Sequence, residues 1–169
     1  MRNLPKAYEH TYEEGIEYQD FVSDQLYDRG IPVLCHYASK QYQLKKGENK
    51  LGVEIKYDRK MKTTGNIFIE IGEKSKTGKF VKSGLYRDDN SWLYAIGDYE
   101  LIFVFSKKYL KRLYESDHNR LISKDEKGRW RLKTGLFKKT PIETSDGFII
   151  SIKEAELYAE IIIRPKEKL

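Results

Sequence analysis

Apolar and polar positions alternate along two short stretches in the middle of the chain, which predicts β-strands. The runs VEIKY (Val53–Tyr57) and NIFIEI (Asn66–Ile71) are rich in apolar side chains at every second position, the period of a strand with one buried face. The residues between them, DRKMKTT, predict the turn of a hairpin. A third run, YELIFVF (Tyr99–Phe105), is continuously apolar and predicts a strand covered on both faces.

Helical periodicity marks the region before these strands. Apolar side chains recur at helical spacing and predict a helix face that packs on a core: Tyr18, Phe21, Val22 and Leu26. The sequence Thr11-Tyr-Glu-Glu14 has the pattern of a capping box and predicts the start of this helix. Gly30 and Pro32 predict its end.

Other segments complete the pattern with less regular signals. IPVLCHYAS and QYQL predict one long or bent strand before Val53–Tyr57. The stretch Ser91–Ile96 is open to interpretation as a short helix. Ser106 predicts the N-cap of a helix over KKYLKRLYES. GFIISI (Gly147–Ile152) predicts a short strand or the lead-in to the last helix. A second capping box at Ser151-Ile-Lys-Glu154 predicts this helix from Lys153 to about Ile163.

The resulting order is helix, three strands, helix, strand, helix, which predicts an α/β (α+β) fold with a mixed sheet flanked by helices. The chain has 169 residues, the length of one ordinary domain. We therefore expect a single domain over residues 1–169.

Composition favours a globular protein with a charged surface, because 34% of residues are charged and 13% are aromatic. No apolar run approaches the roughly 20 residues that span a bilayer, and the first residues, MRNLPKAYEH, lack the apolar core of a signal peptide. No membrane partner and a cytoplasmic location are therefore expected. Cys35 is the single cysteine, which excludes an intramolecular disulfide and a zinc site built from several cysteines.

The formal net charge of +6 favours a polyanionic partner. Two segments concentrate the basic residues. Lys74–Arg87 has five basic residues and no acidic one, and Lys124–Lys139 has seven basic and two acidic residues. Lysine, arginine and hydroxyl groups are common phosphate contacts, although solvated surface loops would show the same composition.

The predicted hairpin would bring several charged residues to one sheet face. If Asp58 pairs with Asn66, Glu54 pairs with Glu70, and alternation puts Lys56 on the same face. Two glutamates directly opposite each other repel, unless a cation lies between them. Mg²⁺ binds carboxylate oxygens and keeps waters for a substrate phosphate. A solvated face with Glu–Lys cross-strand pairs is the alternative interpretation.

These residues also resemble a known family. The pattern VEIK followed by a second acid in IFIEI, within GENKLGVEIKYDRKMKTTGNIFIEI and followed by SGLYRDDNSWLY, resembles the PD-(D/E)xK nuclease superfamily, in particular its small phage and prophage members. The resemblance covers roughly Thr11–Phe105. It implies a restriction-endonuclease-like fold and an endonuclease that hydrolyses phosphodiester bonds of nucleic acid, with DNA as the expected substrate and Mg²⁺ or Mn²⁺ as cofactor.

Carried over by residue, the resemblance makes Glu54 and Glu70 the catalytic, metal-binding acids. The lysine of the family motif normally stands two residues after the second acid, where this chain has Gly72. Lys56 would then be a migrated catalytic lysine on the adjacent strand. In an alternative alignment VEIK is itself the Glu-x-Lys strand, and Glu48 is the earlier acid.

The remaining candidates have weaker support from the pattern. Asp58 would be a further metal ligand or a turn residue, and Glu17 a supporting acid or a solvated helix residue. The candidate nucleic-acid contacts are Lys74, Lys82 and Ser83. A homodimer that cuts both strands would suit this class. Two other functions stay open: a non-catalytic nucleic-acid-binding protein with a nuclease-like fold, and a phage protein that acts on a host partner.

Overall fold

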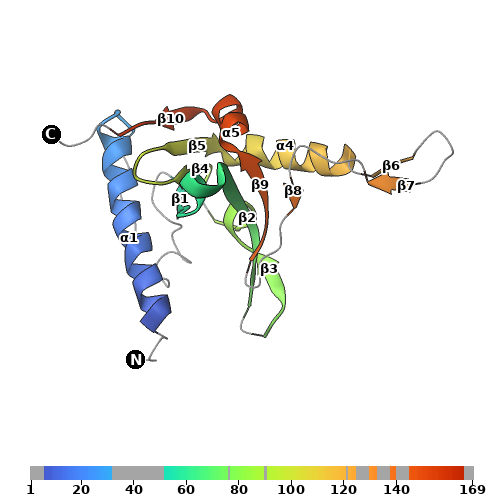
Figure 1. Ribbon diagram of the computed structural model, residues 1–169, viewed down its shortest axis with the longest axis horizontal. Coiled ribbons are helices and arrows are strands. Elements are labelled where there is room, and N and C mark those ends of the chain that lie inside the picture. Colours follow the sequence, from blue (N-terminus) through green and yellow to red (C-terminus); the bar gives the residue numbers. More distant parts are fainter. Residues whose placement is uncertain are drawn as a thin grey trace. The chain divides into compact units, whose positions relative to one another are not determined.

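The computed structural model (Figure 1) has a mixed α/β architecture of sheets and helices. The residues it describes are 6–31, 52–75, 77–89, 91–120, 122–124, 130–132, 138–139 and 145–165. The chain divides into two compact units, and each combines segments that are distant in sequence. The first comprises Met1–Arg59, Asp89–Val104 and Glu160–Leu169, and the second Lys60–Asp88 and Phe105–Ala159. The single-domain expectation stays a prediction.

The first unit contains a four-stranded sheet of order β1-β4-β5-β10. The strands are β1 (Val53–Tyr57), β4 (Leu93–Gly97), β5 (Ile102–Ser106, whose last residues belong to the second unit) and β10 (Ile161–Ile163). β1 and β4 are parallel, whereas β10 is antiparallel to β5. The described part of β5 is buried along most of its length, as its continuous apolar sequence predicted.

Helix α1 (Lys6–Tyr27) packs on one face of this sheet. Its predicted apolar positions Tyr18, Val22 and Leu26 are fully buried against Val53 and Ile55 of β1, which confirms the predicted helix face. The helix begins at Lys6, so the predicted start at a Thr11 capping box is wrong: that sequence lies inside a helix that has already formed its first turn.

The second unit is built around a sheet of order β3-β2-β9-β8. The strands are β2 (Asn66–Lys74), β3 (Phe80–Lys82), β8 (Lys138–Lys139) and β9 (Ser145–Ser151). Its other described elements are α3 (Met61–Thr64), the 3₁₀ turn η1 (Gly84–Tyr86), α4 (Lys107–Arg120), the pair β6 (Ile122–Lys124) and β7 (Trp130–Leu132), and α5 (Ile152–Tyr158). Buried Ile67, Ile69, Phe148 and Ile150 from β2 and β9 lie on one face of this sheet.

The predicted hairpin between β1 and β2 does not form. β1 pairs with β4 and β2 pairs with β3 and β9, so Glu54 lies opposite Tyr94 and Glu70 lies opposite Gly147. The connecting residues form the short helix α3, which ends at Gly65 with a left-handed φ of 67°. β1 has buried residues on both faces, as expected of a strand in a parallel pair rather than one in a half-solvated hairpin.

Two other sequence predictions are wrong in their secondary structure. The proposed short helix at Ser91–Ile96 is largely strand β4, whose five residues are all buried. The last helix ends at Tyr158, and Ile161–Ile163 form β10 instead of a continuing helix. Consecutive β-branched side chains favour a strand once an edge is available, and β5 supplies that edge.

Several local predictions are confirmed. The Ser151 side chain accepts a hydrogen bond from the backbone N–H of Glu154, while Glu154 accepts one from the backbone N–H of Ser151, which is the predicted capping box. The Ser106 hydroxyl accepts from the backbone N–H of Tyr109 at 3.3 Å, as an N-cap does. The predicted strand over IPVLCHYAS and QYQL, together with Cys35, lies outside the described residues.

Among the helices in the described part of the chain, none has the length and apolar character needed to span a membrane.

Candidate functional site

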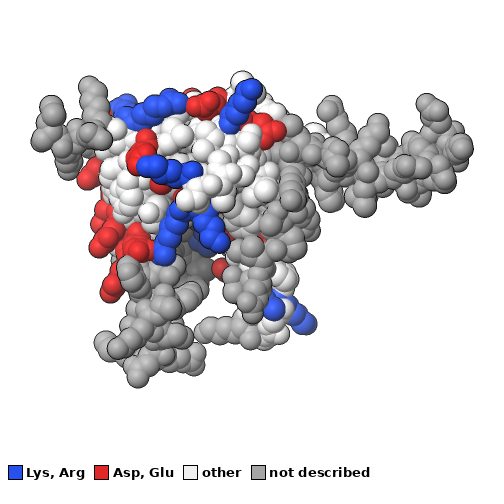
Figure 2. Space-filling model, in the orientation of Figure 1, with Lys and Arg blue, Asp and Glu red and all other residues white. Residues whose placement is uncertain are grey.

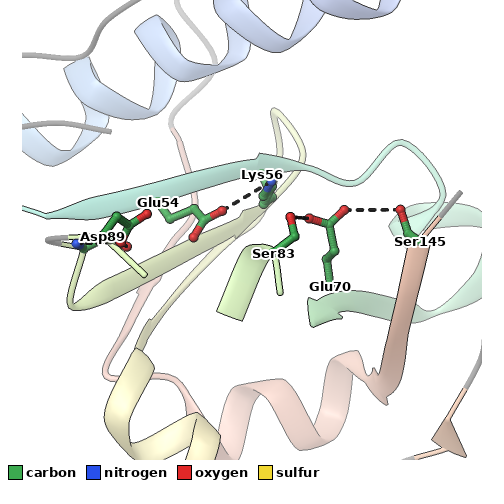
Figure 3. Close-up of polar contacts among 7 residues, drawn as sticks. Glu54, Lys56, Glu70, Ser83, Asp89 and Ser145 are labelled. Carbon is green, nitrogen blue, oxygen red and sulfur yellow. Dashed lines mark hydrogen bonds and ion pairs between the residues drawn. The ribbon is translucent and has the colours of Figure 1, made fainter. Parts of the chain in front are cut away.

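Glu54 and Lys56 form an ion pair on one face of β1. The Lys56 Nζ lies 3.3 Å from the Glu54 Oε1, with 0% of the Glu54 side chain exposed and 29% of the Lys56 side chain exposed (Figure 3). The two residues are neighbours on this face because side chains alternate along a strand. A buried carboxylate is thus held beside a cation that solvent reaches. The sequence predicted that the two residues share a face, but not that they form an ion pair.

The opposite face of β1 explains why this pair is positioned firmly. Val53 and Ile55 point to the other side of the strand and belong to the buried core with α1. Parallel hydrogen bonding to β4 fixes Glu54 opposite Tyr94 and Lys56 opposite Ile96. The strand therefore cannot rotate to expose Glu54 without losing both its core and its ladder.

Asp58 lies just beyond the end of β1. It follows the last residue of β1, and its backbone N–H donates to the carbonyl of Gly97 at 2.8 Å. Four residues of extended chain place the Cα atoms of Asp58 and Glu54 about 13 Å apart. Asp58 as a further metal ligand or a turn residue stays a prediction.

Asp89 lies toward the other end of the β1–β4 pair. The backbone N–H groups of Trp92 and Leu93 donate to the carbonyl of Gly52, which places the segment leading into β4 beside the start of β1. The Asp89 Oδ1 accepts hydrogen bonds from both the backbone N–H and the hydroxyl of Ser91, and Figure 3 labels its side chain. Asp89 lies within the segment SGLYRDDNSWLY, but the sequence pattern predicted no role for it. The Asp-x-Ser turn is the feature of the sequence that could have indicated its position.

Glu17 lies away from Glu54. It is an exposed residue of α1, and α1 packs on the Val53 and Ile55 face of β1, opposite to the Glu54 face. Its charge is one of the causes, after burial and Tyr57, that raise the pKa of Tyr99. The structure thus does not bring Glu17 to the predicted metal site.

Glu70, in the second unit, is held by two serines. The Ser83 hydroxyl donates to Glu70 Oε1 at 2.6 Å, and the Ser145 hydroxyl donates to Oε2 at 3.3 Å (Figure 3). Ser83 is only 1% exposed. The prediction of Ser83 as a surface contact for phosphate is therefore wrong, since its side chain is buried against a carboxylate.

Two glycines allow other parts of the second unit to pack closely against β2 near Glu70. Gly84 follows Ser83 with a φ of +51°, and a Cβ there would lie 2.3 Å from the Glu70 carbonyl oxygen. Gly147 lies opposite Glu70, and a Cβ there would lie 2.5 Å from the ring of Phe68. The close approach of η1 to β2, which brings Ser83 to Glu70, thus needs glycine at position 84.

A β-bulge at Ile71 changes which residues of β2 share a face with Glu70. Glu70 pairs with Gly147, but Gly72 already pairs with Asp146. Adjacent residues of β9 point to opposite faces, so Glu70 and Gly72 do too. Lys74 shares the Gly72 face. Of the three candidate nucleic-acid contacts, Lys74 and Lys82 therefore lie on the face away from Glu70, whereas Ser83 lies on the Glu70 face.

Two tyrosines outside these carboxylate sites have strongly perturbed acidity. Burial, followed by the charge of Asp98, raises the pKa of Tyr18, whose ring is stacked on that of Tyr57 with centroids 4.7 Å apart. Burial and a 2.9 Å hydrogen bond to Glu115 raise the pKa of Tyr86. Both phenols therefore keep their protons to a higher pH than an exposed tyrosine does.

Within the described residues, no cluster of three or more His, Cys, Asp or Glu side chains is arranged to hold a metal ion. Mg²⁺ often takes only one or two carboxylates, with waters and substrate phosphates completing its shell. Glu54 has the oxygen ligand that this ion requires, and Asp89 is the second carboxylate that the fold brings to the same end of β1 and β4. Glu48, the alternative acid, lies outside the described residues.

Comparisons of the chain with protein-family models, with curated proteins and with solved structures gave no match.

Proposed function

We propose that this protein is a metal-dependent endonuclease, a phosphodiesterase that acts on nucleic acid, with DNA as its substrate and Mg²⁺ or Mn²⁺ as its cofactor. The proposal extends the resemblance to the PD-(D/E)xK superfamily, including its restriction-endonuclease-like fold, a cytoplasmic location and a homodimer for double-strand cleavage. The observation that carries it is the buried Glu54 carboxylate held 3.3 Å from the partly exposed Lys56 ammonium.

The residues of the pair would have different roles. Glu54, with Asp89 as the second candidate, would hold the cation through carboxylate oxygens. When bound, the metal supplies Lewis-acid stabilisation of the phosphoryl oxygens and a bound water of lowered pKa. Lys56 would orient the attacking water and stabilise the negative charge that develops on phosphorus-bound oxygens. Glu70, which the resemblance names as the second acid, is retained as a catalytic candidate that mutagenesis must test.

A cleavage assay tests this proposal most directly. Labelled single-stranded, duplex and branched DNA would be incubated with Mg²⁺ or Mn²⁺ and with wild type, Glu54→Gln, Lys56→Met or Glu70→Gln. Glu73→Gln is the matched control, because Glu73 is an exposed carboxylate of β2. We expect Glu54→Gln and Lys56→Met to reduce cleavage about 100-fold or more, and Glu73→Gln to leave it unchanged. Calorimetric titration with Mn²⁺ would show weaker binding for Glu54→Gln.

Two outcomes would contradict the nuclease proposal. Cleavage that Glu54→Gln retains would show that the activity does not use this pair or comes from a contaminant. Absence of cleavage by wild type under every metal, with salt-sensitive DNA binding intact, would favour the non-catalytic nucleic-acid-binding protein. Absence of both would leave the phage interaction protein as the better interpretation.

A further inference from the structure

The β2–β3 hairpin has one face that is basic and aromatic. β3 pairs with β2 so that Lys74 lies opposite Phe80 and Gly72 opposite Lys82. Paired residues share a face, and alternate residues of one strand share it too, so Lys74, Phe80 and Lys82 point to the same side. The intervening residues, Glu73 and Val81, point to the other side.

The side chains of this face are open to solvent. Lys74, Lys82 and Phe80 are all exposed, with 51% of Phe80 accessible. β3 is the edge strand of its sheet, and the β9 partner of β2 ends at Ser145, opposite Glu73. Among the described residues, Lys74 therefore has β3 as its one neighbouring strand, and the outer part of the hairpin extends past the described part of β9. Figure 2 shows Lys or Arg atoms beside uncharged atoms at this hairpin.

Backbone hydrogen bonds between described residues join the two strands of the hairpin near its turn. Its turn is closed by backbone hydrogen bonds from Ser75 to Lys79 at 2.7 Å and from Gly78 to Ser75 at 2.9 Å, with Gly78 at a φ of +79°. A Cβ on Gly72 would lie 4.0 Å from the Phe80 ring, so the ring lies above the glycine on this face. The Phe80 ring thus lies over the backbone of Gly72, with Lys74 and Lys82 as its neighbours on the same face. Asp146 of β9 lies opposite Gly72 and adds a carboxylate on the β9 side.

We infer that this face binds a nucleic-acid strand, with Phe80 stacked on an unpaired base and Lys74 and Lys82 on the flanking phosphates. An aromatic ring among cations is the composition of single-strand binding surfaces, where bases stack and the backbone is neutralised. A membrane surface fits less well, because the two exposed apolar residues Phe80 and Val81 lie on opposite faces. The inference rests on the proposed function only in taking nucleic acid as the ligand. It restricts the substrate of the proposed nuclease to strands with unpaired bases.

Binding by the full chain would be measured by fluorescence anisotropy in EDTA, with labelled single-stranded and duplex DNA at several salt concentrations. Phe80→Ala is expected to weaken single-strand binding about 5- to 150-fold, and Phe80→Trp to retain it. Val81→Ala, on the other face, is the matched control. Lys74→Ala/Lys82→Ala should reduce the slope of log K against log salt by about 1.4. The control pair Lys108→Ala/Lys153→Ala, exposed lysines of the same unit, should change it less.

The outcomes separate this inference from the nuclease proposal. If DNA binding depends on the hairpin residues but no metal-dependent cleavage occurs, the inference about the hairpin is supported and the nuclease proposal is contradicted. If wild type cleaves DNA but the hairpin variants bind it as tightly as the control variants do, only the inference about the hairpin is overturned. Binding to anionic lipid vesicles but not to DNA would also overturn it, as would tighter binding to duplex than to single strands. Thermal unfolding of each variant would confirm that the exposed substitutions leave the fold intact.

Discussion

The Ser83 hydroxyl donates a hydrogen bond of 2.6 Å to Glu70, although the two residues are 13 positions apart in the chain. A short hydrogen bond to a carboxylate is of the stronger, charge-assisted kind. Because Ser83 is also the N-cap of η1, the contact ties the start of this turn to β2. Glu70 is thus held by the residues around it before any ligand is considered.

Loss of Ser83 should therefore cost more than loss of Ser145. Ser83→Ala removes a buried donor from a carboxylate and is expected to lower the free energy of unfolding by about 1–3 kcal/mol. Ser145→Ala removes the longer 3.3 Å bond and should cost less than about 1 kcal/mol. Urea denaturation of both variants measures the difference, and equal losses would contradict the geometric ranking.

Gly84 should be far less replaceable than Gly78. Both have positive φ angles, but a Cβ at Gly84 would meet the Glu70 carbonyl, whereas nothing lies within 4 Å of one at Gly78. Gly78→Ala should lower the free energy of unfolding by about 1–2 kcal/mol, because alanine is strained in a left-handed backbone conformation. Gly84→Ala should cost clearly more, because η1 must also move away from β2. Chemical denaturation of the two variants provides the comparison, and similar losses would show that η1 adjusts easily.

The Glu54–Lys56 pair should show energetic coupling in a double-mutant cycle. Lys56→Met removes the cation 3.3 Å from a buried carboxylate and should lower the free energy of unfolding by about 1–3 kcal/mol. This loss is smaller than for a fully buried ion pair, because the lysine reaches solvent. Glu54→Gln/Lys56→Met should be more stable than the sum of the single changes predicts, by about 0.5–3 kcal/mol. Urea unfolding supplies all four free energies; additive losses would mean that the two charges do not interact.

Alkaline pH should destabilise the fold through Tyr18. Burial raises the pKa of this phenol above its ordinary value of 10.0, so the folded state keeps the proton that the unfolded state releases. The stabilisation is complete below pH 10 and is lost as pH rises, with a slope of up to about 1.4 kcal/mol per pH unit. Tyr18→Phe should flatten that slope.

The test compares unfolding free energies of wild type and Tyr18→Phe from about pH 9 to about pH 11, above the ordinary phenol pKa. Parallel pH dependences would mean that Tyr18 ionises in the folded protein as easily as in the unfolded chain, which contradicts its burial in the aromatic cluster with Tyr57.

Local patterns were sufficient where neighbouring residues decide the structure. The apolar face of α1 and the capping box at Ser151 were predicted from short-range spacing. A strand was predicted at Tyr99–Phe105, and β5 covers Ile102–Ser106. The pairing of β1 with β4 was not, because it joins segments far apart in the chain, and a hairpin between β1 and β2 was the simpler local solution. The end of α5 was also missed, since only tertiary pairing with β5 makes Ile161–Ile163 a strand.

The same distinction applies to the candidate site. Glu54 and Lys56 share a face because they are two residues apart on one strand, so alternation alone predicted their common face but not their ion pair. The partners of Glu70 come from η1 and β9, and no spacing in the sequence relates Ser83 or Ser145 to it. Asp89 was overlooked because its position beside the start of β1 depends on the parallel pairing.

The bulge at Ile71 restricts how this chain could be converted to the common family pattern. A lysine introduced by Gly72→Lys would complete Glu-x-Lys on β2 in the sequence, yet its side chain would project from the face opposite Glu70. Beyond the bulge, the residue of β2 that shares the Glu70 face is Glu73, opposite Ser145, so a lysine beside Glu70 would have to stand at position 73. Motif searches that count residues assume an uninterrupted strand, and here that assumption would identify a catalytic pair whose members point away from each other.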